Sequence, residues 1–66
     1  MSRFAHHDIG FGYWIIAERV GSGTEYHACK LDRPGGFIVD GKSKHLPRMG
    51  DAKKQVQAWI DAESNR

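Results

Sequence analysis

The sequence lacks the disulfide bonds that stabilise many small domains. Its 66 residues include a single cysteine, Cys29, so no disulfide can form within the chain. The longest apolar run, Tyr13 to Ala17, is far too short to cross a bilayer, and no signal peptide is visible at the N-terminus. These absences predict a cytoplasmic protein of a reducing compartment, with no membrane partner.

A strong excess of positive charge is also missing. The net charge of +2 is well below what dedicated nucleic-acid binders usually carry. The sequence has no nucleophile elbow, phosphate loop or paired-carboxylate motif, and so short a chain can barely build a catalytic pocket. We therefore expect a non-enzymatic protein with no catalytic residues. A small endoribonuclease toxin that uses Lys42, His45 and Arg48 on phosphate stays a third alternative.

Histidines are the obvious metal-ligand candidates. His27 and Cys29 are two residues apart on a predicted strand, so they share a face, and both are residue types that bind zinc. The other possible metal ligands are His6, His7, Asp8 and His45. None of these residues forms a C-x-x-C or H-x-x-x-H motif. The simpler interpretation pairs His27 with Glu18 across two strands and buries Cys29 as a small apolar residue. We expect no metal and no other cofactor.

Most of the remaining chain has strand character. Residues 1–12 show no periodicity and predict a loose lead-in. The stretch 11–20 is rich in aromatic and β-branched residues, "GSGT" at 21–24 predicts a turn, and 25–31 predicts a second strand.

A second hairpin is expected after the break at "DRPGG". Asp-Gly at 40–41 is a strong signal for a tight hairpin turn and would join short strands at 36–39 and 42–46. A two-residue turn places Phe37, Val39, Lys42 and Lys44 on one face; a three-residue loop would change this sorting.

The C-terminal segment predicts an amphipathic helix. Ala52, Val56, Trp59 and Ile60 recur at helical spacing and form one apolar stripe, which should end near the charged Glu63. The expected fold is α+β: an antiparallel sheet of three to four strands with one C-terminal helix packed on one face. The single ββββα domain should span 13–63, and 64–66 should fray.

A helix can cover only one side of such a sheet, so the sheet should keep an uncovered face. A four-residue turn would place Val20 opposite Glu25, and this register sorts the strand residues into two sets. We assign the first set to the core, since its residues match what Trp59 and Ile60 would bury. That set is Trp14, Ile16, Cys29 and Leu31.

The second set is then the expected binding surface. It carries two tyrosines and two cations, with Arg19 directly across from Tyr26, and two further lysines would extend it. The candidate binding residues are Tyr13, Arg19, Tyr26, Lys30, Lys42 and Lys44. The alternative is an ordinary solvated face. Ala58 and Ala62 form a second small-residue stripe on the helix, which could seat a partner helix.

The element order, the turn "VDGK" at 39–42 and the helix opening "DAKKQVQAWI" at 51–60 resemble two related DNA-binding domains. These are the arm-site-binding domains of tyrosine-type integrases and the plant ethylene-response-factor fold, and the likeness covers 13–63. It implies that the uncovered sheet face enters the DNA major groove. Such domains usually bring more arginines and lysines to the sheet and are joined to a catalytic domain.

The size and style of the chain also resemble phage-encoded accessory proteins, including anti-CRISPR and other anti-host factors. That likeness implies a small inhibitor, cytoplasmic in the host cell, that occupies the surface of a host protein or nucleoprotein complex. We take this as the expected function, because a chain with a net charge of +2 has few cations for salt-dependent binding to phosphate groups. Sequence-specific DNA binding is the alternative, and a second copy of the chain is a further candidate partner.

Overall fold

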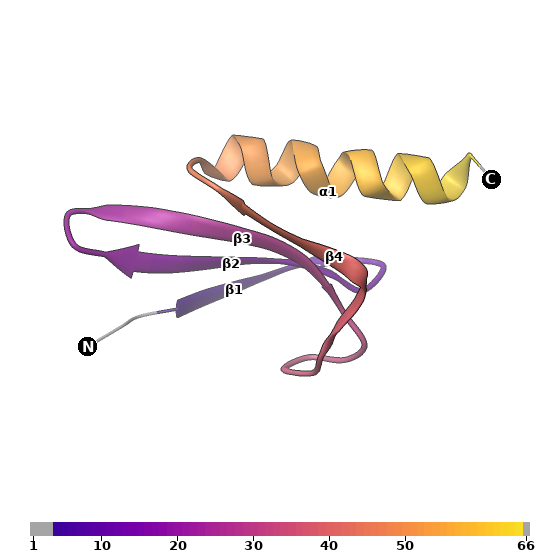
Figure 1. The fold of residues 1–66 in the computed structure, drawn as a ribbon, viewed down its shortest axis with the longest axis horizontal. Helices are drawn as coiled ribbons and strands as arrows, with labels where there is room; N and C mark the ends of the chain where they lie inside the picture. The colour runs from indigo at the N-terminus through magenta and orange to yellow at the C-terminus, as the bar shows by residue number, and fades with distance from the viewer. Residues whose placement is uncertain (1–3, 66) are drawn as a thin grey trace.

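The computed structural model describes residues 4–65. Four antiparallel strands form one sheet in the order of the chain, β1 (Phe4–Gly10), β2 (Tyr13–Val20), β3 (Gly23–Leu31) and β4 (Ile38–Leu46). The helix α1 (Met49–Ser64) then runs back across one side of the sheet (Figure 1). The expected α+β class, with one C-terminal helix packed on an antiparallel sheet, is confirmed. No helix of the described residues is long and apolar enough to cross a membrane.

The register of the β2–β3 hairpin differs from the expected one. Val20 lies opposite Gly23 rather than Glu25, so the turn contains two residues, with Gly21 at a φ of 57°. Tight two-residue hairpins need such positive φ values, which glycine adopts without strain. The error is a shift of two residues. Because side chains alternate with a period of two, the sorting of residues into two faces is unaffected.

The expected loose lead-in is wrong for residues 4–10, which form the edge strand β1. Its main chain pairs with β2, for example Ala5 with Ala17 and His7 with Ile15. Nearly all of its side chains are exposed, so no apolar periodicity marks it in the sequence. Backbone pairing with β2 positions this strand, and residues 1–3 lie outside the described part of the chain.

The expected hairpin at 36–46 is also wrong. Asp40 and Gly41 do have positive φ values, 56° and 64°, but they lie inside one continuous strand, β4. Cys29 pairs with Ser43 and Leu31 with Ile38, so the segment 39–42 bulges opposite a single residue of β3. The chain reverses instead in the loop 32–37, which follows Leu31 and contains "PGG".

The helix prediction is confirmed. Ala52 and Val56 are buried, and Trp59 and Ile60 are half-buried against the same core. Asp51 lies in the first turn, where the helix dipole favours a carboxylate. The helix extends through Ser64, one residue into the expected frayed tail; Arg66 lies outside the described residues.

The core lies on the side of the sheet opposite to the expected one. Tyr13, Ile15 and Ala28 are fully buried beneath α1, where they meet Ala52 and Val56. Two small residues, Ala28 of the sheet and Ala52 of the helix, are part of this contact and are fully buried. The half-buried residues around this cluster are Tyr26, Leu46, Met49, Trp59 and Ile60.

Candidate docking face

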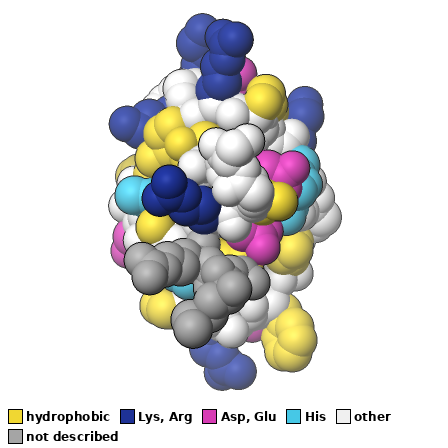
Figure 2. Space-filling model, turned by 90° about the vertical axis from the view of Figure 1, so that its left-hand side faces the viewer, with side chains coloured by type: hydrophobic (Ala, Val, Ile, Leu, Met, Phe, Trp, Pro, Cys, Tyr) yellow, Lys and Arg dark blue, Asp and Glu magenta, His cyan; other side chains and the backbone are white. Residues whose placement is uncertain are grey.

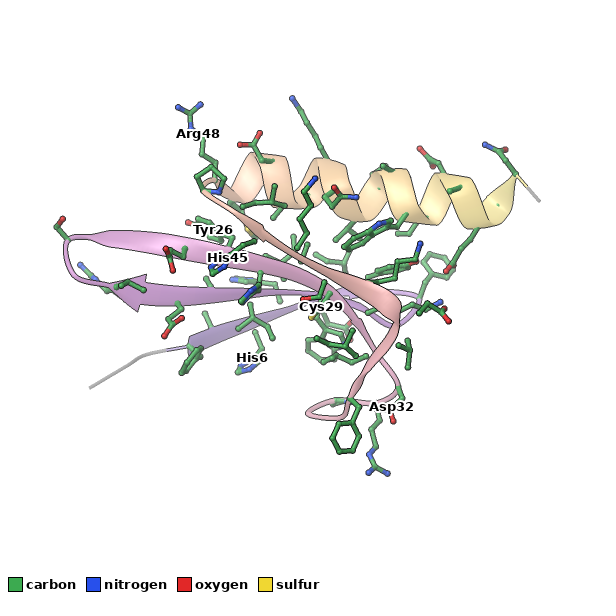
Figure 3. The ribbon with its side chains drawn as sticks, viewed as in Figure 1. His6, Tyr26, Cys29, Asp32, His45 and Arg48 are labelled. Atoms are coloured by element: carbon green, nitrogen blue, oxygen red, sulfur yellow. The ribbon has the colours of Figure 1, made fainter. Side chains whose placement is uncertain are left out.

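The side of the sheet that faces away from α1 contains an apolar hollow of about 580 Å³. Its floor is the set of residues that the sequence had suggested as core, and the loop 32–37 folds down on this side of the sheet as a wall (Figures 1 and 3). We call this side the hollow face. The hollow is lined by His6, Trp14, Ile16, His27, Cys29, Leu31, Pro34, Gly35, Gly36, Ile38 and Ser43.

The wall of the hollow is held in one conformation by its own hydrogen bonds. The Asp32 amide donates to the Phe37 carbonyl (3.1 Å), and the Phe37 amide donates to Asp32 Oδ1 (2.9 Å). The Gly36 amide also donates to the Arg33 carbonyl (2.8 Å). A Cβ at Gly36 would collide with Asp32 Oδ1, so a larger residue there would displace the side chain that accepts the bond from Phe37. The hollow is thus largely formed before anything binds, as ligand sites usually are.

The floor offers little chemistry. Cys29 is 3% exposed, and burial raises the pKa of its thiol above the ordinary value of 9.0. A buried thiol of this kind stays protonated and behaves as a small apolar side chain, not as a nucleophile. The hollow is therefore suited to receiving an apolar group rather than to reacting with one.

Two histidines stack beside the hollow. The His27 and His45 rings lie 3.9 Å apart between centroids, and His45 Nε2 is 3.3 Å from Glu25 Oε2. The expected pairing of His27 with Glu18 is wrong, because Glu18 lies opposite Glu25 and His27 opposite Ile16. Among residues 4–65, no group of three or more histidine, cysteine or acidic side chains is arranged to hold a metal ion.

The charged strand residues of the hollow face are acidic, and the loop 32–37 adds one residue of each sign, Asp32 and Arg33. The strand register places three carboxylates and three histidines there, and among residues 4–65 it places no strand lysine or arginine on this side. Figure 2 shows Lys and Arg side chains at the top of the molecule, around α1, but also at its flanks and one at the bottom, on the side away from α1. The carboxylates are Asp8, Glu18 and Glu25, and the histidines are His6, His27 and His45.

All six residues predicted as a binding surface lie on the helix side, so the face assignment is wrong. Tyr13 is fully buried, its ring 5.9 Å from that of Trp59, and Tyr26 is half-buried against the core. Arg19 is exposed but lies opposite Thr24, so its expected pairing with Tyr26 is wrong.

Two of the three predicted lysines contact residues of the helix, and the third lies on the same side of the sheet. Lys30 Nζ is 2.7 Å from Glu63 Oε1 and 3.6 Å from Asp40 Oδ2, and it also lies 5.3 Å from the centre of the Tyr13 ring. Lys42 Nζ lies 5.7 Å from the centre of the Trp59 ring, and Lys44 is exposed opposite Ala28. Lys30 and Lys42 therefore support the packing of α1 rather than forming a free surface.

Two signals in the sequence point to the correct face. Ala28 gives one set of strand residues a small side chain at its centre, and helices approach sheets most closely over small residues. Glu63 ends the apolar stripe of the helix, so a lysine and a tyrosine hydroxyl are suitable partners for it, and Lys30 and Tyr13 belong to that same set. The prediction instead assigned the large apolar side chains of Trp14 and Leu31 to the core.

Comparison of the chain with protein-family models, with curated proteins and with solved structures found no match.

Proposed function

We propose that this protein is a non-enzymatic binding module that docks on another protein through the hollow face. The hollow supports this proposal, since about 580 Å³ is large enough for an aromatic or branched side chain and its neighbours. Protein interfaces are typically organised around such anchor side chains, which fill a preformed pocket surrounded by a polar rim. Exposed apolar residues continue the surface at the loop, where Phe37 is 77% and Ile38 is 51% exposed.

The charge distribution favours a protein over a nucleic acid as the partner. The DNA-reading alternative needs arginine and lysine on the uncovered side of the sheet, and Arg19 and Lys30 lie on the other side. A face that carries Asp8, Glu18 and Glu25 repels phosphate instead of attracting it. Docking by one rigid face on a host protein is also the mode of action expected of a phage-type inhibitor, and we keep that role as part of the proposal.

Site-specific photocrosslinking tests the proposed function. A benzoylphenylalanine at Phe37 keeps the main-chain bonds of the loop and places the probe beside the hollow, while the same probe at Lys54 reports on the outer side of α1. In extract of the natural host cell, we expect one adduct of discrete mass from position 37 and none from position 54. Adducts from position 54 alone would contradict the proposal.

A pair of variants makes the crosslinking result specific. Ile38→Asp puts a charge on the lining of the hollow at a half-exposed position and should abolish the adduct without unfolding the protein. Phe11→Ser removes a side chain that is 80% exposed in the β1–β2 turn and does not line the hollow. This control should leave the adduct intact.

A further inference from the structure

The hollow face carries an acidic pair next to the hollow. Glu18 and Glu25 lie directly opposite each other on β2 and β3. Directly opposite side chains in antiparallel strands have Cβ atoms about 4.5–5.5 Å apart, so two carboxylates there destabilise the free protein. Among residues 4–65 neither carboxylate has a lysine or arginine within ion-pair distance; Glu25 has only His45, at 3.3 Å.

The position of this pair relative to the hollow is fixed by the register. Ile16 and His27, which lie opposite each other, line the hollow, and Glu18 and Glu25 are the next pair on the same face. Two residues along a strand span about 7 Å. A partner segment therefore meets the apolar hollow and the acidic pair within the length of a few residues.

We infer that the partner presents a segment in which an apolar anchor side chain enters the hollow while a lysine or arginine two to four residues away binds between Glu18 and Glu25. This inference rests on the proposed function and adds the chemistry of the partner to it. A cation at that place relieves the repulsion between the two carboxylates. The binding free energy therefore includes the relief of a repulsion that is already present in the free protein. Glu18 and Glu25, with no strand lysine or arginine on this face among the described residues, disfavour an acidic segment at this pair.

Three capped heptapeptides test the inference on the full chain. The first, Ac-Ser-Trp-Ser-Arg-Ser-Arg-Ser-NH2, has both anchor and cations, the second replaces both arginines by glutamate, and the third replaces the tryptophan by serine. Binding is followed by NMR chemical shifts of the Ile16 and Ile38 methyl groups, which report on the hollow, and of the Glu18 and Glu25 amides.

We expect the first peptide to shift both groups of signals and to bind about tenfold more tightly than the second. The double variant Glu18→Gln/Glu25→Gln should remove that difference, while Asp61→Asn, which changes an exposed carboxylate on α1, should preserve it. The third peptide should bind measurably more weakly than the first, because it has no anchor.

Failure of the inference and failure of the proposed function give different results. If the first two peptides shift the hollow signals equally, the inference about charge is overturned and the docking face stands. If none shifts the hollow signals, both are overturned. If short duplex DNA shifts the Glu18 and Glu25 amides and the arginine peptide does not, the partner is a nucleic acid and both are overturned.

Discussion

At the scale of single residues, Glu63 connects the end of the helix to the sheet. Its Oε1 accepts hydrogen bonds from Lys30 Nζ (2.7 Å) and from the Tyr13 hydroxyl (2.8 Å). These bonds, the one from Lys30 first, hold the pKa of Glu63 below its ordinary value of 4.5. Burial, followed by the bond to Glu63, raises the pKa of Tyr13 above 10.0. The native state therefore favours a charged Glu63 and a neutral Tyr13.

Acid should remove this contribution to stability. A carboxyl group whose pKa is lower in the folded than in the unfolded state stabilises the fold above its ordinary pKa, and the effect is lost as the pH falls through the folded-state value. We expect Glu63→Gln to lower the urea midpoint at about pH 7, and we expect the gap from the parent chain to close as the pH falls below 4.5 and through the lowered pKa of Glu63. Asp61→Asn, on the same helix, should not lower the midpoint. A gap that persists in acid would mean that Glu63 acts through packing alone.

At the scale of elements, strand β4 shows what local sequence can and cannot decide. Asp40-Gly41 has the left-handed backbone that its sequence predicts, yet it forms a bulge and not a hairpin. The conformation of two residues is a local property. Whether the flanking segments pair with each other or with β3 depends on a competing strand that local sequence does not reveal.

The same distinction explains the other successes and failures. The stripe of α1 could be predicted, since its apolar residues recur over more than two helical turns. The strand character of β2 and β3 could be predicted from their aromatic and β-branched residues on either side of a turn signal. Strand β1 could not, because its side chains are exposed and its pairing uses the backbone. The sorting of residues into two faces also followed from the sequence. The choice of covered face did not, because both sets contain aromatic and aliphatic residues of similar size.

Two glycine substitutions test the conformation of these elements. Gly41 has a φ of 64° and no neighbour within 4 Å of an added Cβ, so Gly41→Ala introduces backbone strain without a clash and should destabilise the protein by about 1–2 kcal/mol. Gly50 lies in the first turn of α1, equally free of neighbours, and Gly50→Ala should stabilise it by up to about 1 kcal/mol. Chemical denaturation of both variants should give changes of opposite sign; a neutral Gly41→Ala would contradict the positive φ.

At the scale of the whole molecule, the core is small. In the described part of the chain, the fully buried residues between helix and sheet are Tyr13, Ile15, Ala28, Ala52 and Val56. A domain of this size without disulfides rarely has more than about 3–5 kcal/mol of net stability. The layer of side chains between helix and sheet must supply most of it, since the hollow face, apart from Cys29, leaves its apolar residues half-buried or exposed.

Loss of one core side chain should therefore unfold much of the population. Ile15→Ala removes a fully buried side chain at the centre of this layer and should cost about 2–5 kcal/mol, close to the total stability. Ile38→Ala removes the same atoms from a half-exposed position on the other side of the sheet and should cost less than about 1 kcal/mol. Thermal unfolding monitored by circular dichroism compares the two. Equal losses would mean that the hollow face contributes as much to the fold as the helix side does.

The two tryptophans lie on opposite surfaces of a one-sheet molecule, Trp14 in the hollow and Trp59 beneath the helix. Each indole is consequently an optical probe of one side. In a Trp59→Phe background the remaining emission reports events in the hollow, and in a Trp14→Phe background it reports the detachment of α1. Fluorescence can then distinguish binding of a partner in the hollow from detachment of the helix.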